Sequence, residues 1–300
     1  MVSSADARRA APTGSPGGGA PDAIAELSRI ATAAAAQIGG ENFPVALRVL
    51  PRQPRDHLQR AYAFARFVDD VGDESHGDRL ALLDAVDRDI DALPEGAARL
   101  TPVRDLGPLV HQHRLALQPL HDLVEANRRD QLVSRYETFE DLLDYCRLSA
   151  APVGRMVLAV ADVDDADAAA RSDKICAALQ VLEHCQDVGE DAAAGRVYLP
   201  AHDLAAAGVG DADLRRDTTS PALRRVLALQ IERAGRLLDE GKPLIKQLHG
   251  WARLAVLGYV AGGRATAAAI RRADYDVLAR TVRPSKPGTV WHAARLAAGR

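Results

Sequence analysis

Residues 179–200 read LQVLEHCQDVGEDAAAGRVYLP and carry the strongest structural signal in the chain. On a helix their polar side chains fall on one stripe, which comprises Gln180, Glu183, Asp187 and Glu190 with Asp191. Carboxylates near the C-terminus of a helix are unfavourable because the helix dipole is negative there, so their clustering favours a bound cation. Gly195 is expected to end the helix. Arg196 and Tyr198 can then reach back as donors to an anion.

Residues 180–191 form the second acidic segment of the chain. The first acidic segment, YAFARFVDDVGDE, occupies residues 62–74. It also places its polar side chains on one helical stripe, formed by Tyr62, Arg66, Asp69, Asp70 and Asp73. Asp69 and Asp73 would lie about 6 Å apart along the helix axis, where like charges repel each other. A hard divalent cation such as Mg²⁺ would offset that repulsion. Taken alone, the segment is equally compatible with a solvated acidic helix end.

The remainder of the chain is also predicted to be helical. Period-two runs typical of strands are almost absent, whereas alanine, leucine and charged residues recur at helical spacing between prolines and glycines. The predicted helices cover residues 24–38, 55–75, 78–93, 102–117, 119–131, 138–161, 167–191, 221–248, 250–268 and 268–281. Pro152 lies inside one of them and predicts a kink. We therefore expect one all-α domain over residues 23–287, between a disordered tail at 1–22 and a C-terminal tail at 288–300.

Composition excludes several classes of protein. The formal net charge of −3 over 300 residues leaves no overall basic field for binding nucleic acid. Three cysteines without CxxC spacing indicate reduced, buried thiols in a cytoplasmic protein. No apolar run is long enough to span a membrane. Neither a GxxxxGK[ST] nor a GxGxxG motif occurs, so a bound phosphate would have to be held by metal ions and basic side chains.

The two acidic stripes together predict a metal site. Acidic residues that face each other in the core of a helical bundle build such sites, and carboxylate oxygens suit Mg²⁺. A diphosphate chelated between the stripes would become a good leaving group, because the ions neutralise charge as the C–O bond breaks. Arg66 and Arg196 would donate hydrogen bonds to its oxygens.

The acidic segments, the GRVYLP run and residues 270–286 resemble the squalene and phytoene synthase family over about residues 40–287. This resemblance implies an all-α isoprenoid (terpenoid) synthase bundle with a central apolar cavity, in which Mg²⁺ assists loss of diphosphate and starts carbocation chemistry. The implied metal ligands are Asp69, Asp73, Asp187 and Asp191, and Asp70 and Glu183 complete the candidate set. The candidate substrate-binding residues are Arg66, Gln180, Arg196 and Tyr198. The candidate catalytic residues are Arg66, which would bind diphosphate, and Tyr62 and Tyr145, which would lie near the reacting carbons.

Within that family, residues 41–46 and 145–155 look most like the hydroxysqualene synthase branch. That branch converts presqualene diphosphate and water to hydroxysqualene and diphosphate, in the bacterial route to squalene and hopanoids. The chain departs from the family at Glu183, where asparagine is usual. This departure leaves the ligand at position 183 and the number of metal ions open.

Two alternatives remain at this stage. The chain is also compatible with a head-to-head prenyl transferase, which would make presqualene diphosphate or phytoene. From a different class, an all-α nucleotide pyrophosphohydrolase also uses acidic helices and Mg²⁺. Because the expected product is a lipid, contact with the inner face of the membrane and with other enzymes of the squalene pathway is expected as well, although the sequence assigns no docking face.

Overall fold

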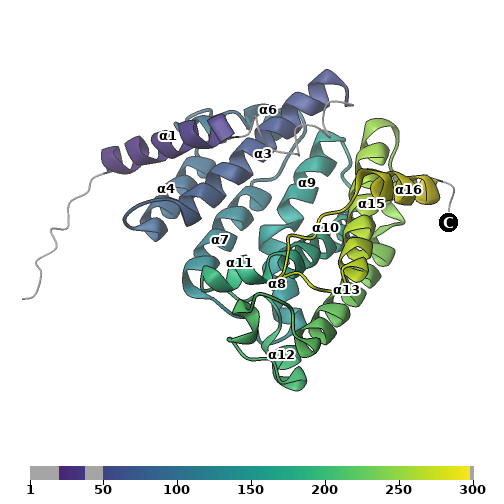
Figure 1. Ribbon diagram of the computed structural model, residues 1–300. Coiled ribbons are helices and arrows are strands. Elements are labelled where there is room, and N and C mark those ends of the chain that lie inside the picture. The colour runs from purple at the N-terminus through teal and green to yellow at the C-terminus, as the bar shows by residue number, and fades with distance from the viewer. Residues whose placement is uncertain (1–19, 38–49, 298–300) are drawn as a thin grey trace, which may run out of the picture.

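The computed structural model, shown in Figure 1, describes residues 20–37 and 50–297, and these residues form a helical assembly. Its elements are α1 (Ala20–Gln37), α3 (Arg52–Asp73), α4 (Arg79–Asp91), α5 (Thr101–Arg104), α6 (Gly107–His111), α7 (Gln118–Leu132), α8 (Phe139–Ser149), α9 (Ala151–Val160), α10 (Ala166–Gln186), α11 (Val188–Ala193), α12 (Ala201–Ala207), the 3₁₀ helix η2 (Asp213–Arg215), α13 (Pro221–Gly241), α14 (Leu244–Gln247), α15 (Gly250–Arg272) and α16 (Lys286–Ala297). Among the described residues, β-structure is limited to one isolated bridge between Arg135 and Val197. The all-α prediction is confirmed.

The helices bury two adjoining apolar cores. One core lies among α1, α3, α4 and α7 and includes the fully buried Phe64 and Phe67. The other lies among α8, α10, α13 and α15 and includes Leu182 and Ile231. Helix α9 packs against α3 and α7 on one side and α10 on the other, so it joins the two cores. The acidic segments therefore lie on helices of different cores, α3 in the first and α10 in the second.

Several predicted helix boundaries need correction. The kink expected near Pro152 is present as a break at Ala150, which separates α8 from α9. The helix predicted over 268–281 is wrong, because α15 continues unbroken to Arg272 and the chain then turns through two residues of positive φ, Asp274 and Tyr275. Helix α12 was not predicted, and neither was α16, which lies within the expected C-terminal tail.

Parts of the prediction lie outside the described residues. They are residues 1–19 of the expected tail and the motif at 41–46 that favours the hydroxysqualene synthase branch. The cysteines are described, and all three are free, as predicted. Burial raises the pKa of Cys176 to about 11 and those of Cys146 and Cys185 to about 12, so their thiols stay protonated at neutral pH.

Gly154 allows α9 and α10 to approach closely. A Cβ atom at this position would lie 2.6 Å from Cys176 Sγ and closer still to Ser172 Oγ, both on α10. We expect Gly154→Ala to lower the free energy of unfolding by about 1–3 kcal/mol, because a packed interface resists an added methyl group. Urea denaturation followed by circular dichroism measures this change. The matched control is Gly258→Ala on α15, where the added methyl group meets open space and improves helix propensity. Equal effects of the two substitutions would contradict the packing argument.

Candidate active site

Helix α3 presents its acidic residues in two environments. Asp69 and Asp73 are exposed to solvent, whereas Asp70 is buried and its carboxylate lies 2.9 Å from Arg66 Nε. Arg66 also lies 3.7 Å from the carboxylate of Glu74. This division follows from the helix, because Asp69 and Asp73 share one face and Asp70 is rotated about 100° from Asp69. Asp69 and Asp73 can thus contact a ligand from solvent, whereas the buried Asp70 forms an ion pair that orients Arg66.

Helix α7 contributes an amide to the same face. The amide nitrogen of Asn127 donates to Asp69 Oδ1 at 3.1 Å and to the backbone oxygen of Leu123 at 3.2 Å. Gly72 makes this approach possible, because a Cβ atom there would collide with the Asn127 side chain. Although Asp69 is open to solvent, the protein around it desolvates its carboxylate and raises its pKa to about 6, with Asp73 adding repulsion.

The second acidic segment is interrupted at Asp187. The sequence predicts one helix over 167–191, but α10 ends at Gln186 and α11 begins at Val188. Glu190 and Asp191 therefore lie in the first turn of a helix, where the dipole favours negative charge. The prediction that the helix dipole disfavours these carboxylates was wrong for Glu190 and Asp191. It holds only for Glu183, which lies at the C-terminal end of α10.

Asp187 has an unfavourable electrostatic environment. Desolvation and repulsion from Glu183, Asp191 and Glu190 raise its pKa to about 6. Deprotonated near neutral pH, its carboxylate adds to a concentration of negative charge at the α10–α11 junction. A divalent cation or a set of basic groups would relieve that repulsion.

The GRVYLP segment connects the two acidic regions. Helix α11 ends just before Gly195, as predicted, and Gly195 has a positive φ of 84°. The chain then runs beside residues 134–137, where the amide of Val197 donates to the backbone oxygen of Ser134 at 2.8 Å. This placement lets Arg196 Nη2 donate to Asp73 Oδ1 at 2.6 Å. Burial disfavours charge on Arg196, but the bond to Asp73 outweighs it and raises the pKa of Arg196, so the guanidinium stays charged.

Asp130 on α7 accepts hydrogen bonds from two aromatic residues of the site. The hydroxyl of Tyr145 donates to its carboxylate at 2.7 Å and that of Tyr198 at 3.3 Å, while Arg196 Nη1 lies 3.9 Å away. Burial raises the pKa of Asp130, although the Tyr145 hydrogen bond and Arg196 oppose that shift. The rings of Tyr145 and Tyr198 lie 5.5 Å apart, and each lies within 6 Å of the Tyr136 ring. Sequence reasoning missed Asp130, because no acidic motif surrounds it.

His184 lies at the other side of Tyr198. The two rings stack at a centroid distance of 3.8 Å, and His184 Nδ1 lies 3.7 Å from the carboxylate of Asp191. Its Nε2 lies 3.3 Å from the side-chain nitrogen of Gln180. A narrow recess is lined by His184, Asp191, Arg196 and Tyr198. Two residues of the second acidic segment and two of the GRVYLP segment thus line the same recess.

Side-chain contacts join six of the predicted site residues in two groups. One joins Asp73, Arg196, Tyr198 and Tyr145 around Asp130, and the other joins Gln180 and Asp191 through His184. Tyr62 is half-buried on α3, one turn before Arg66. Sequence reasoning missed Asn127 and gave His184 no role. Their contacts with Asp69 and Asp191 depend on tertiary packing, and no spacing in the sequence reveals them.

The donor chemistry fits Mg²⁺, although the carboxylates do not form a compact ligand cluster. Exposed carboxylates on α3 and exposed or half-buried ones at the α10–α11 junction are the hard oxygen ligands this ion prefers, and Asp69 and Asp187 have raised pKa values that a cation would lower. Over residues 20–37 and 50–297, no group of three or more His, Cys, Asp or Glu side chains has the geometry to hold a metal ion by itself. Mg²⁺ that keeps several waters and is shared with a diphosphate needs few protein ligands on each side.

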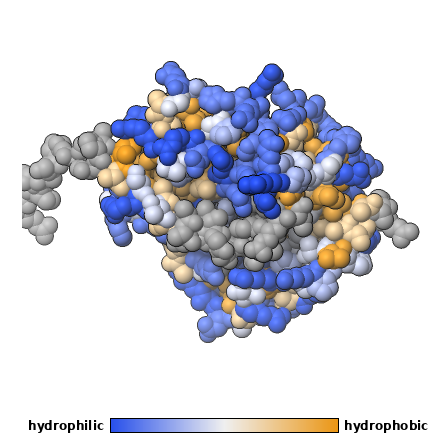
Figure 2. All heavy atoms as spheres, turned by 90° about the horizontal axis from the view of Figure 1, so that it is seen from above, coloured by the Kyte–Doolittle hydropathy of each residue, from blue (hydrophilic) through white to orange (hydrophobic). Residues whose placement is uncertain are grey.

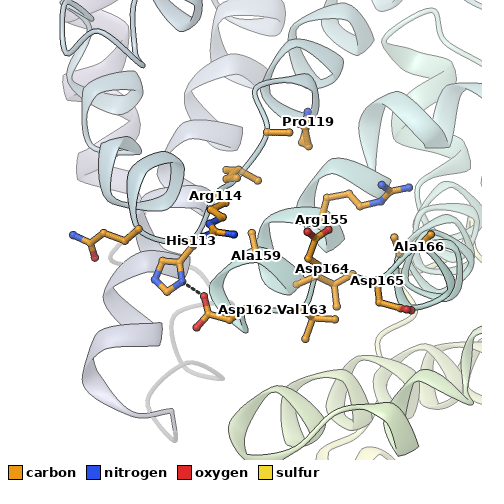
Figure 3. Close-up of a pocket in the computed structure, with 15 residues that line it drawn as sticks. His113, Arg114, Pro119, Arg155, Ala159, Asp162, Val163, Asp164, Asp165 and Ala166 are labelled. Atoms are coloured by element: carbon orange, nitrogen blue, oxygen red, sulfur yellow. Dashed lines mark hydrogen bonds and ion pairs between the residues drawn. The ribbon is translucent and has the colours of Figure 1, made fainter.

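A pocket of about 680 Å³ lies away from these residues (Figure 3). It lies between the loop that holds His113 and Arg114, the end of α9 and the start of α10. Inside it His113 Nδ1 contacts Asp162 at 2.8 Å, and none of the predicted site residues lines it. This pocket is therefore separate from the acidic segments and from the GRVYLP segment.

The raised pKa of Asp187 predicts that its charge destabilises the cation-free protein. The pKa of Asp187 is about 6 in the folded state, against an ordinary value of 3.8. Between these two pH values the folded state binds more protons than the unfolded state, so the free energy of unfolding falls as the pH rises. Asp187→Asn should therefore raise the melting temperature at about pH 7.5, and the gain should shrink towards about pH 4. Differential scanning calorimetry in chelator measures both values. The exposed Asp217→Asn is the control, and a lower melting temperature for Asp187→Asn at neutral pH would contradict the prediction.

Comparisons with known proteins identify similar chains. A family model described as squalene/phytoene synthase matches residues 37–288. The hydroxysqualene synthase of Zymomonas mobilis is 34% identical over 266 residues, which cover 87% of this chain and 88% of that protein. The hydroxysqualene synthase of Rhodopseudomonas palustris is 36% identical over 214 residues, which cover 69% of this chain and 71% of that protein. The crystal structure of squalene synthase HpnC from Alicyclobacillus acidocaldarius has a TM-score of 0.75 and 41% identity, and the match covers 84% of this chain and 98% of that one.

Proposed function

Because the chain belongs to the squalene/phytoene synthase family, we propose that it is a synthase that converts presqualene diphosphate and water to hydroxysqualene and diphosphate. The similarity to two hydroxysqualene synthases supports this branch of the family. The single observation that carries the proposal is the bond from Arg196 to Asp73, which joins the GRVYLP segment after the second acidic motif to the first acidic motif. A diphosphate between the two motifs would meet carboxylates on both sides and cationic groups between them.

Mg²⁺ would be held by carboxylates of the two acidic segments. The proposed ligands are Asp69, Asp73, Asp187 and Asp191, with Asp70 and Glu183 as further candidates. The ions would neutralise the charge that develops on diphosphate as its bond to carbon breaks. Asp70 is the weakest candidate, because it is buried and paired with Arg66.

The basic residues would bind and orient the leaving group. Arg66 is fixed by Asp70, and Arg196 is shared between Asp73 and Asp130, so both guanidinium groups are held in place before substrate arrives. Planar guanidinium groups suit bidentate bonds to phosphate oxygens. Gln180 and Tyr198 would contact the substrate from the opposite side.

Aromatic side chains would face the cation formed when diphosphate leaves. Tyr145 directs its hydroxyl to Asp130 and is proposed to lie near the reacting carbons, whereas the Tyr198 ring is stacked on His184 and would contact the substrate through its hydroxyl edge. The face of an aromatic ring stabilises positive charge, and the hydrocarbon part of the substrate would lie in the predicted apolar cavity. Tyr62 is proposed to act in the same way from α3.

Product analysis with three substrates tests the proposal. The protein is incubated with presqualene, farnesyl or geranylgeranyl diphosphate in the presence of Mg²⁺, and products are identified by mass spectrometry. Hydroxysqualene from presqualene diphosphate, lost on addition of EDTA and restored by Mg²⁺, is the expected result. Presqualene diphosphate or phytoene as the product would instead establish the head-to-head prenyl transferase alternative. Hydrolysis of nucleoside triphosphates to monophosphates, the alternative from another class, would contradict the proposal, and the family match already argues against it.

A further inference from the structure

The C-terminal helix α16 leaves two adjacent large apolar side chains in solvent. Val290 is 68% exposed and Trp291 is 54% exposed, and no residue of α16 is buried. The helix packs against α15, on which Leu254 is also 65% exposed. Figure 2 shows hydrophobic residues gathered at this edge of the molecule, beside the grey C-terminal residues. Adjacent exposed tryptophan and valine are unfavourable in water unless they meet an apolar partner.

The surroundings of these side chains are positively charged. Although the whole chain has a net charge of −3, residues 277–300 contain no aspartate or glutamate and five basic residues: Arg280, Arg283, Lys286, Arg295 and Arg300. The first four are exposed. Arg295 lies one turn after Trp291, with its guanidinium carbon 4.8 Å from the centre of the indole ring. Val290 and Trp291 therefore have basic neighbours in the chain, and residues 277–300 contribute no carboxylate that would neutralise them.

The opposite side of α16 faces the protein. Leu296 is half-buried and packs against the core of α8, α10, α13 and α15. His292 is half-buried, and burial together with Arg264, Arg295 and Arg272 lowers its pKa, so it adds no charge at neutral pH. Helix α16 thus has an inner side that is fixed to the protein and an outer side that carries Val290 and Trp291.

We propose that this C-terminal surface, formed by Arg280, Arg283, Lys286, Val290, Trp291 and Arg295, docks on the surface of an anionic lipid membrane. Tryptophan favours the interfacial region of a bilayer, where its ring is apolar and its N–H stays hydrated. Basic residues are attracted to anionic headgroups, and the attraction adds over several side chains. Over residues 20–37 and 50–297 no helix is long and apolar enough to cross a membrane, so the inferred contact is peripheral.

A lipid surface fits these observations better than a protein partner. The exposed apolar area on α16 consists of two side chains, which is small for the core of a stable protein–protein interface. The positive charge of residues 277–300 complements an anionic surface, and it would repel the same segment of a second copy of this chain. The proposal does not depend on the identity of the substrate, because vesicle binding needs none.

Vesicle sedimentation tests the docking surface. The full chain is mixed with vesicles of phosphatidylglycerol and phosphatidylcholine, or of phosphatidylcholine alone. We expect binding to the anionic vesicles that weakens with added salt, and little binding to the neutral ones. The double substitution Val290→Ser/Trp291→Ser and the charge reversal Arg280→Glu/Arg283→Glu should each weaken binding at least about tenfold. The matched control is Leu132→Ser on α7, which removes a side chain that is 75% exposed elsewhere and should bind as the unmodified chain does.

A spectroscopic measurement separates docking from misfolding. The chain has two tryptophans, so Trp251→Phe leaves Trp291 as the single indole. Its emission should shift to shorter wavelength when anionic vesicles are added, and circular dichroism should stay unchanged. Undiminished binding of the Val290→Ser/Trp291→Ser variant would overturn the proposal. The proposal would also be overturned if the emission of Trp291 shifted to shorter wavelength as the protein concentration rises without vesicles. That result would identify a second copy of the chain as the partner.

Discussion

Replacing Asp187 by alanine is expected to reduce turnover of the isoprenoid diphosphate by about 100-fold to 1,000-fold, the range found when a group that stabilises developing charge is removed. Asp187 lies between α10 and α11, where desolvation and repulsion from three other carboxylates raise its pKa to about 6. Such a group is unfavourable for folding, and its presence is explained if it binds a cation. Release of diphosphate, measured at saturating substrate and Mg²⁺, gives kcat for the variant and the unmodified chain.

Loss of fold must be separated from loss of function in this variant. Because the charge of Asp187 destabilises the cation-free protein, its removal should leave the melting temperature unchanged or higher, while activity falls. Asp217→Ala removes an exposed carboxylate from the loop between η2 and α13 and should retain full turnover. An Asp187→Ala enzyme with the turnover of the unmodified chain would eliminate this residue from the metal site.

Asp130→Asn is expected to lower kcat by about 10-fold to 100-fold with a smaller change in KM, the effect typical of a residue that orients functional groups. The carboxylate accepts hydrogen bonds from Tyr145 and Tyr198 and lies near Arg196, so it is a positioning residue for three predicted site residues. Asparagine keeps the size of the side chain but loses one acceptor oxygen and the negative charge. Steady-state kinetics of diphosphate release measures the split between kcat and KM.

A double-mutant cycle with Tyr145→Phe distinguishes positioning from a general loss of stability. If Asp130 acts by orienting Tyr145, the two substitutions should be strongly non-additive, because the second one removes a bond that the first has already broken. The control is Asp211→Asn, which breaks a 2.6 Å pair with Arg135 on the exposed surface and should leave kcat unchanged. Independent, additive effects of Asp130→Asn and Tyr145→Phe would reject the positioning role.

Much of the helical framework could be predicted because helical periodicity, prolines and glycines act locally. Helix α7 and the start of α13 at Pro221 agree with prediction to within a residue or so. The break near Pro152 and the end of the helix before Gly195 were expected, because proline disrupts a helix interior and glycine readily ends a helix. The break at Asp187 was missed, since neither proline nor a required positive φ marks it. Helix α16 was missed although a local signal marks its start, where the amide of Gly288 donates to Ser285 Oγ.

The sequence by itself determined the all-α class, the two acidic stripes and the family to which they belong. The class and each stripe rest on residues within about 20 positions of one another, where spacing fixes which side chains share a face. The family resemblance combines several such local segments, at 62–74, 179–200 and 270–286. Only the tertiary structure decided that Asp130 holds Tyr145 and Tyr198, that Asn127 donates to Asp69, and that Arg196 reaches Asp73. These contacts join residues up to 123 positions apart, and they depend on how packed helices approach one another, which no local pattern encodes.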